Sequence, residues 1–213
     1  MKVYKFGGAS VKDAAGIRNM AEIVSGASGN LVIVVSAFGK TTNALEKVLK
    51  AWISEDKNYQ DLLDEVFHYH HSVINELFAG KLSIAGNINN SFALLREYLS
   101  AGRRGVYDFE YDQVVSYGEL WSTIIVAGFL ETLIPDTGWI DIRINLLTDD
   151  RFRDANILWS ESRHRLLKVF DFKARRIYIT QGFIEVLFQG KLLLLEERAP
   201  TILPLLSQSL RCF

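Results

Sequence analysis

The chain has 213 residues, a formal net charge of −1 and a single cysteine, Cys212. This length can bury one substantial core in one or two domains, and one cysteine cannot form an intrachain disulfide. The near-neutral charge gives no reason to expect nucleic acid or an acidic surface as a partner. We expect no signal peptide, because the opening strand carries charges, and the sequence has no run of about 18 uncharged apolar residues that could cross a membrane. We therefore expect a soluble, cytoplasmic protein.

Strand-like and helical patterns alternate along most of the chain. Residues 3–6 predict a strand, and the β-branched run at 30–36 predicts a second strand that is buried on both faces. Helical spacing of apolar residues predicts five helices, at 14–25, 43–52, 59–78, 90–102 and 111–133. Further strands are expected at 137–142 and 176–180. The alternation predicts an α/β sandwich with a mainly parallel sheet.

The first candidate site follows the opening strand. Gly7 and Gly8 are adjacent, with Lys5 before them and Ser10 after them. Without a Cβ, such a pair lets the backbone turn sharply and approach a ligand. A helix that begins near Asp13 would add its positive end, and this combination suits a phosphate. The alternative is an ordinary turn from strand to helix, and the glycines alone leave both interpretations open.

A second candidate site follows the buried strand. Residues 36–43 (SAFGKTTN) form a loop rich in hydroxyl groups, at the end of a central strand where open α/β sheets bind ligands. Ser36 and Thr42 can donate hydrogen bonds to carboxylate or phosphate oxygens. Alternatively, Thr41, Thr42 or Asn43 caps the helix that follows. The two interpretations are compatible.

A third candidate is Glu119, which stands within an otherwise apolar helical segment. An ionised carboxylate there is costly unless it is paired, so Glu119 could bind the ammonium group of a substrate. The alternative is a surface position.

His68, His70 and His71 suggest a metal site, but neighbouring histidines cannot share one helix face. We expect instead a solvated helix with one packed histidine, and no metal site.

Together these motifs closely resemble the aspartate kinase family, a branch of the amino-acid-kinase superfamily. Residues 5–11 (KFGGASV) resemble its opening KFGGTSV signature, with Ala9 in place of the usual threonine or serine. Residues 34–43 and 116–123 are similar to its VVSAxxxxTN loop and its SxGExxS/T segment. Residues 141–149 and 178–184 resemble a later D-x-R…T-D stretch and the VTQGFIG strand.

The resemblance implies a three-layer α/β/α sandwich that is incomplete here, and ATP-dependent phosphorylation of the β-carboxylate of L-aspartate to 4-phospho-L-aspartate. It implies ATP and Mg²⁺ as cofactors and a homo-oligomeric intact enzyme. Lys5 would be catalytic and would neutralise the transferred phosphoryl group. The site it implies further contains Gly7, Gly8 and Ser10 for phosphate, and Ser36, Thr42 and Glu119 for aspartate. Another amino-acid kinase, for glutamate or acetylglutamate, is the weaker alternative.

The tail departs from the family. Its TTTLGREGSDYTAA-like segment, which supplies an arginine for the substrate and an aspartate beside the reaction centre, is missing from residues 185–213. With suitable codons for that continuation, translation one base out of frame gives residues 185–201, so we predict a one-base deletion near codon 185. Residues 185–190 (EVLFQG) also resemble a viral 3C-protease cleavage site used in tags, but Lys191 follows in place of proline, so we interpret this likeness as a coincidence. We expect residues 1–184 to be the aspartate-binding part of the catalytic domain.

On this interpretation the 213-residue chain is catalytically inactive. The alternative function is a non-catalytic remnant that binds aspartate weakly or associates with itself.

Overall fold

Four parallel strands form the central sheet of the described chain. The computed structural model describes residues 1–79, 83–148, 156–182, 184–185 and 194–195. In these residues the strands lie in the order β1-β2-β4-β3. Their bounds are β1 Lys2–Phe6, β2 Leu31–Val35, β3 Thr137–Trp139 and β4 Ile177–Gln181. A short antiparallel pair joins β5 (Ile184–Glu185) to β6 (Leu194–Leu195). The predicted α/β fold with a parallel sheet is confirmed.

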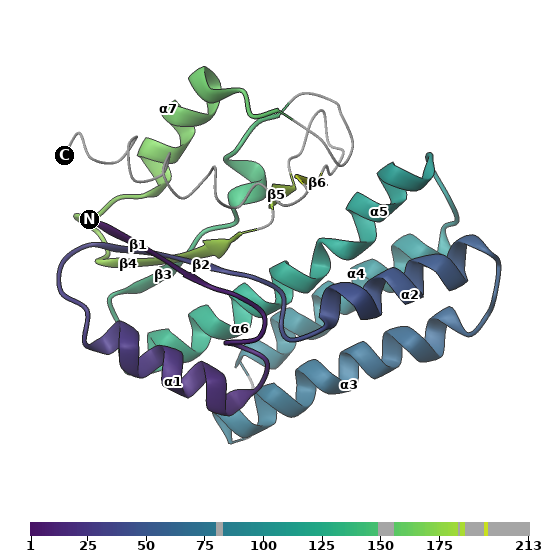
Figure 1. Ribbon diagram of the computed structural model, residues 1–213, viewed down its shortest axis with the longest axis horizontal. Coiled ribbons are helices and arrows are strands. Elements are labelled where there is room, and N and C mark those ends of the chain that lie inside the picture. The colour runs from purple at the N-terminus through teal and green to yellow at the C-terminus, as the bar shows by residue number, and fades with distance from the viewer. Residues whose placement is uncertain (80–82, 149–155, 183, 186–193, 196–213) are drawn as a thin grey trace.

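Helices cover both faces of this sheet, which gives three layers (Figure 1). Helices α1 and α6 lie under one face, and α7 lies over the other. Helices α2 to α5 extend the first layer sideways as a bundle beyond the sheet. The helices are α1 Ala14–Ser25, α2 Thr41–Ile53, α3 Tyr59–Phe78, α4 Ser83–Ser100, α5 Tyr107–Val115, α6 Tyr117–Leu133 and α7 Trp159–Val169, with a 3₁₀ turn at Ile142–Ile144.

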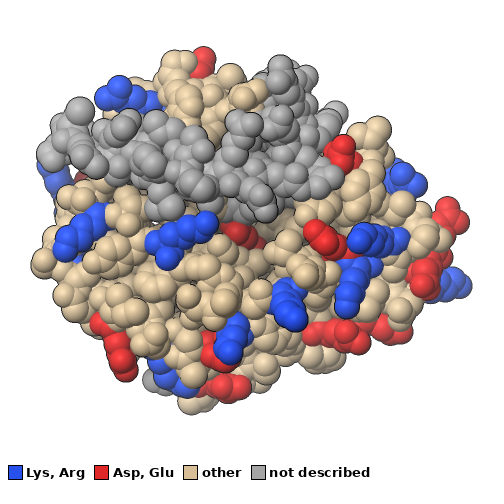
Figure 2. Space-filling model, viewed as in Figure 1, with Lys and Arg blue, Asp and Glu red and all other residues tan. Residues whose placement is uncertain are grey.

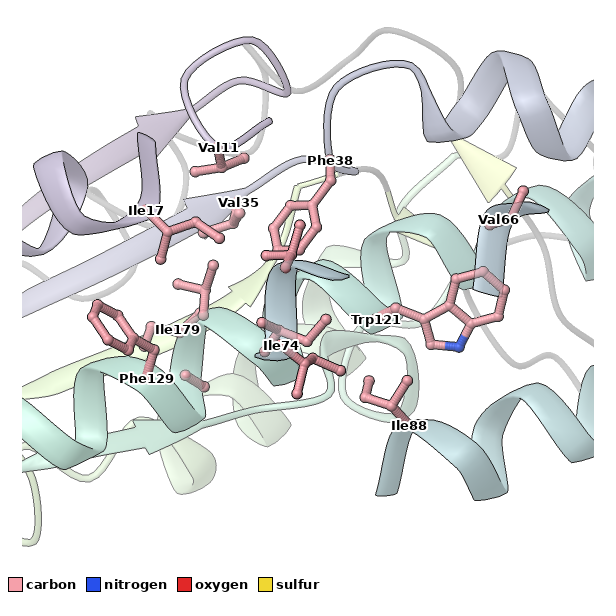
Figure 3. Packing of buried hydrophobic residues seen from close by; sticks show 14 of the residues in the cluster. Val11, Ile17, Val35, Phe38, Val66, Ile74, Ile88, Trp121, Phe129 and Ile179 are labelled. Atoms are coloured by element: carbon pink, nitrogen blue, oxygen red, sulfur yellow. The ribbon is translucent and has the colours of Figure 1, made fainter. Parts of the chain in front are cut away.

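Strand β2 lies at the centre of the core and is buried along its whole length. Leu31, Ile33 and Val35 pack on the side of α1 and α6, in a cluster that continues through the helical bundle (Figure 3). Val32 and Val34 point the opposite way, toward the second cluster under α7. Successive side chains of a strand alternate between faces, so a strand covered on both sides needs an uninterrupted apolar run.

The structure changes several predicted element boundaries. The single helix predicted at 111–133 is two helices, α5 and α6, interrupted at Ser116. The strand predicted at 137–142 ends at Trp139, and a 3₁₀ turn follows. Helix α7 was not predicted. Its sequence WSESRHRLLKV is mostly polar, and only Ser162 and Leu166 are buried, so the apolar period is too weak to identify.

The surface of the helical layers carries mixed charge. On the face shown in Figure 2, lysine and arginine side chains are interspersed with aspartate and glutamate. This distribution accords with the small net charge of the sequence. Among the described residues, no helix combines the length and apolar composition that a membrane crossing requires.

Candidate functional site

The loops that carry the predicted site residues leave the sheet at one edge. In the parallel ladders Phe6 is level with Val35, and Val35 is level with Gln181. The segments after β1, β2 and β4 therefore emerge side by side. This carboxyl edge is where open α/β sheets bind their ligands. The topology thus brings together the Lys-Gly-Gly turn, the hydroxyl-rich loop and the end of β4.

The two adjacent glycines have different surroundings. The Gly39 amide donates to the Gly8 carbonyl at 3.0 Å. A Cβ on Gly8 would lie 2.5 Å from the Ala37 carbonyl oxygen, whereas a Cβ on Gly7 would meet no described residue within 4 Å. Gly8 is therefore required for close packing of the first loop on the second. Among the described residues, none blocks the approach of a ligand to the Gly7 backbone on the side where a Cβ would lie.

Lys5 and Ser10 flank this turn. Lys5 is exposed and lies level with Val34, on the face of the sheet that α7 covers. Ser10 is exposed, and its amide closes the turn by donating to the Gly7 carbonyl at 2.9 Å. The helix predicted to begin near Asp13 does so. The Asp13 carboxylate accepts from the Gly16 amide at 2.8 Å, so one donor of the helix end is already satisfied by a cap.

The second loop is anchored to the first. The Ser36 amide donates to the Phe6 carbonyl at 3.1 Å, and the Thr41 amide donates to the Phe38 carbonyl at 2.9 Å. Helix α2 begins at Thr41, two residues before its predicted start, and its N-cap is Lys40 with no side-chain hydrogen bond. The predicted capping role of the hydroxyl-rich residues is therefore wrong.

Both predicted hydroxyl donors of this loop are partly accessible. Ser36 and Thr42 are half-buried. Thr41 is different, because it is buried and its hydroxyl has no partner among the described residues. Ser36 and Thr42 therefore keep the accessibility that a substrate contact requires, while Thr41 belongs to the packing beneath the loop.

Glu119 is buried at the same edge of the sheet. Its side chain is only 8% exposed, and its Oε2 accepts a hydrogen bond from the Gly182 amide at 2.9 Å. The alternative of a surface position is therefore wrong. The preceding Gly118 brings α6 close to the second loop, since a Cβ there would lie 3.2 Å from the Ala37 Cβ. The Gly182 amide, 63 positions along the chain from Glu119, is a site component that sequence reasoning missed.

Residues of the two remaining motifs contact one another at the end of β4. Asp141 and Arg143 form an ion pair of 2.6 Å, and the Gln181 side chain accepts from the Ile142 amide at 3.0 Å. Asp149 and Phe183, which belong to the same motifs, lie outside the described residues.

The three histidines of α3 do not come together as a metal site. His70 is buried, whereas His71 contacts the Asn89 side chain at 2.7 Å. Within the residues that the structure describes, no three or more histidine, cysteine, aspartate or glutamate side chains are placed to hold a metal ion. The buried His70 matches the expectation of one packed histidine on this helix.

The fold and the site define an open, parallel α/β protein with a Lys-Gly-Gly turn and a buried carboxylate at the carboxyl edge of its sheet. Residues 1–196 match the amino acid kinase family, and the chain belongs to that family.

Several relatives are aspartokinases. The chain is 30% identical over 190 residues to the chloroplastic bifunctional aspartokinase/homoserine dehydrogenase 2 of Arabidopsis thaliana. The aligned region covers 85% of this chain and 20% of that protein. It is 26% identical over 183 residues to the lysine-sensitive aspartokinase 3 of Escherichia coli K12. Here the aligned region covers 85% of this chain and 40% of that protein. The chain thus spans between a fifth and two fifths of the length of these two relatives.

The fold is also similar to that of a solved aspartokinase. The structure of E. coli aspartokinase III in complex with aspartate and ADP superimposes with a TM-score of 0.85 at 21% identity, over 99% of this chain and 47% of that chain. This likeness shows that the fold is shared.

Proposed function

We propose that this chain contains the amino-acid-binding half, and part of the phosphate-binding half, of an aspartate kinase. The reaction would be transfer of the γ-phosphoryl group of ATP to the β-carboxylate of L-aspartate, giving 4-phospho-L-aspartate. Membership of the amino acid kinase family and the likeness to several aspartokinases support this proposal. The observation that carries it is the buried carboxylate of Glu119 at the ligand-binding edge of the sheet.

Glu119 would recognise the ammonium group of aspartate. Its Oε2 accepts from the Gly182 amide, which fixes the direction of the carboxylate in a buried position. A charge–charge contact in such surroundings is stronger than one in bulk solvent. Ser36 and Thr42, from the loop that packs beside α6, would donate hydrogen bonds to the carboxylates of the same substrate.

The opening turn would bind the nucleotide phosphates. Lys5 would neutralise the phosphoryl group in transfer, and the amides of Gly7 and Gly8, with Ser10, would face the phosphate oxygens. Mg²⁺ would be held by the nucleotide phosphates themselves. Phosphoryl transfer depends on positioning and charge stabilisation, which these groups can supply without a covalent intermediate.

For the 213 residues themselves we propose binding without turnover. The segment equivalent to TTTLGREGSDYTAA does not occur among them, so the arginine and aspartate that it would supply are missing.

The division into residues 1–184 and an out-of-frame segment at 185–213 stays a prediction, because the family match runs to residue 196. We further propose that the intact enzyme is a homo-oligomer. A cytoplasmic location also stays a prediction, since several relatives are named as chloroplastic.

The test is isothermal titration of the 213-residue chain with L-aspartate. We expect saturable binding of L-aspartate that is stronger than binding of L-glutamate, and weakening by about tenfold or more in Glu119→Gln, which removes the charge but keeps the shape. Glu22→Gln, at an exposed position on α1, is the matched control and should bind normally. Equal aspartate binding by Glu119→Gln would contradict the assigned role. Normal turnover with ATP and Mg²⁺ would refute the proposal that this chain is inactive.

A further inference from the structure

Helix α3 carries a fully buried histidine that contacts the two elements of the amino-acid site. The His70 ring stacks on Phe38, with ring centroids 5.6 Å apart and planes inclined by 16°. It also meets Trp121 edge-to-face, with centroids 5.2 Å apart and an angle of 72°. Figure 3 shows Phe38 reaching from its loop toward the helices, on the side where Trp121 projects from α6.

These two aromatic neighbours belong to the segments that would hold the substrate. Phe38 is fully buried and stands between Ser36 and Thr42 in the second loop. Trp121 follows Glu119 by two residues on α6, and it is stacked in turn on Phe92 of α4 with centroids 3.6 Å apart. A single ring therefore links the hydroxyl donors to the helix of the carboxylate.

The hydrogen bonding of His70 defines its protonation form. Its Nδ1 lies 2.8 Å from the Val66 carbonyl. Since a carbonyl can only accept, Nδ1 carries the proton and Nε2 is the unprotonated nitrogen. Nε2 is buried and has no partner among the described residues. Burial also lowers the pKa of this imidazole to about 4, so the ring is neutral at physiological pH.

The neighbouring residue attaches the same helix to the loops from a second direction. The Tyr69 hydroxyl donates to the Lys12 carbonyl, just beyond the Lys-Gly-Gly turn. A Cβ on Gly39 would lie 3.0 Å from that hydroxyl, so the second loop passes directly over it. Helix α3 thus contacts both loops.

We propose that His70 is a positioning residue of the amino-acid site, whose neutral ring sets the spacing between the Phe38 loop and the Glu119 helix. This inference rests on the proposed function, in which Thr42 and Glu119 bind the same substrate. His70 would set the distance between them without touching that substrate. Misplacement of binding groups by about 1 Å is enough to lose most of the benefit of orientation.

The principal variant is His70→Leu, which keeps most of the volume but removes the stacking ring. We expect its affinity for L-aspartate, measured by titration of the full 213-residue chain, to fall about tenfold or more. His70→Phe restores a ring and should bind within about threefold of the unaltered chain. Two controls sit on the same helix. Val73→Ala removes a buried side chain from the same core cluster but no aromatic ring, and His68→Leu replaces an exposed histidine.

A second measurement decides the question without a ligand. Amide hydrogen exchange should rise at residues 38–42 in His70→Leu, and should rise less there in Val73→Ala. If the unaltered chain does not bind aspartate, the proposed function fails, and the exchange at residues 38–42 still decides whether His70 holds the loop. Affinity and loop exchange in His70→Leu that match those of Val73→Ala would overturn the proposal.

Discussion

Protonation of His70 should make the stability of this protein fall steeply in mild acid. Burial lowers the pKa of His70 from its ordinary value of 6.5 to about 4, and the nearby His71 acts in the same direction. The hydrogen bond to the Val66 carbonyl opposes the shift. In the folded protein a proton on Nε2 would enter an aromatic enclosure of Phe38, Phe92 and Trp121, so the charged form is penalised.

The sign and size follow from proton linkage. Between pH 6.5 and pH 4 the unfolded chain binds a proton at His70 and the folded chain does not, so the free energy of unfolding rises with pH in this window. The contribution is fully present above pH 6.5 and is lost as the pH falls toward 4. At about 1.4 kcal/mol per pH unit, His70 alone accounts for about 3 kcal/mol. That is a large part of the 5–15 kcal/mol by which typical domains are stable.

The assay is urea denaturation followed by circular dichroism at several pH values between 4.5 and 7.5. His70→Phe lacks the titrating group and keeps the ring, so the carboxyl groups common to both proteins cancel in the difference. We expect the unaltered chain to lose about 2–3 kcal/mol relative to His70→Phe between pH 7.5 and pH 4.5, because this range stops above the folded pKa of about 4. His68→Phe, at an exposed position, should follow the unaltered chain. Parallel curves for the unaltered chain and His70→Phe would show that the buried imidazole does not titrate as argued.

Three further predictions concern the loops and the tail. Gly8→Ala should destabilise the fold by about 1–3 kcal/mol in thermal or urea unfolding, because its methyl group would press on the Ala37 carbonyl, whereas Gly7→Ala should unfold normally. In a frame-repaired protein, Lys5→Ala should reduce turnover by orders of magnitude in a coupled kinase assay while circular dichroism stays unchanged, and normal turnover would exclude the phosphate role. Sequencing the gene around codon 185 should reveal one missing base, and an uninterrupted frame with no GREGSD in any frame would refute the deletion.

The fold was predictable where a local pattern is sufficient. The apolar run of β2 identified a central strand because burial on both faces leaves no room for polar side chains. Helix α1 was predicted with its observed bounds, because its buried residues recur at helical spacing and Asp13 provides an N-cap. The break at Ser116 was not predictable in this way, since α6 is apolar on most sides and its period gives no sign of where a helix turns.

The candidate site was predictable in its residue types but not in its contacts. The buried Glu119 carboxylate accepts from the Gly182 amide, which follows β4 and becomes a neighbour only when the sheet forms. Likewise, nothing in the spacing of the α3 histidines indicates that His70 meets Phe38 and Trp121. Such long-range pairings are products of topology, and a single sequence does not encode them in any local signal.

The opening Gly-Gly pair shows why a motif alone is ambiguous. Gly8 would be required by the contact with Ala37 even if the protein bound no phosphate, so its presence is no evidence for a ligand. Gly7 is different, because nothing in the described structure would obstruct a Cβ there and no packing reason excludes a larger residue. A glycine without a structural requirement, beside an exposed lysine at the carboxyl edge of the sheet, is more informative than the pair. The phosphate assignment therefore depends on Gly7 and Lys5, and the loop packing depends on Gly8.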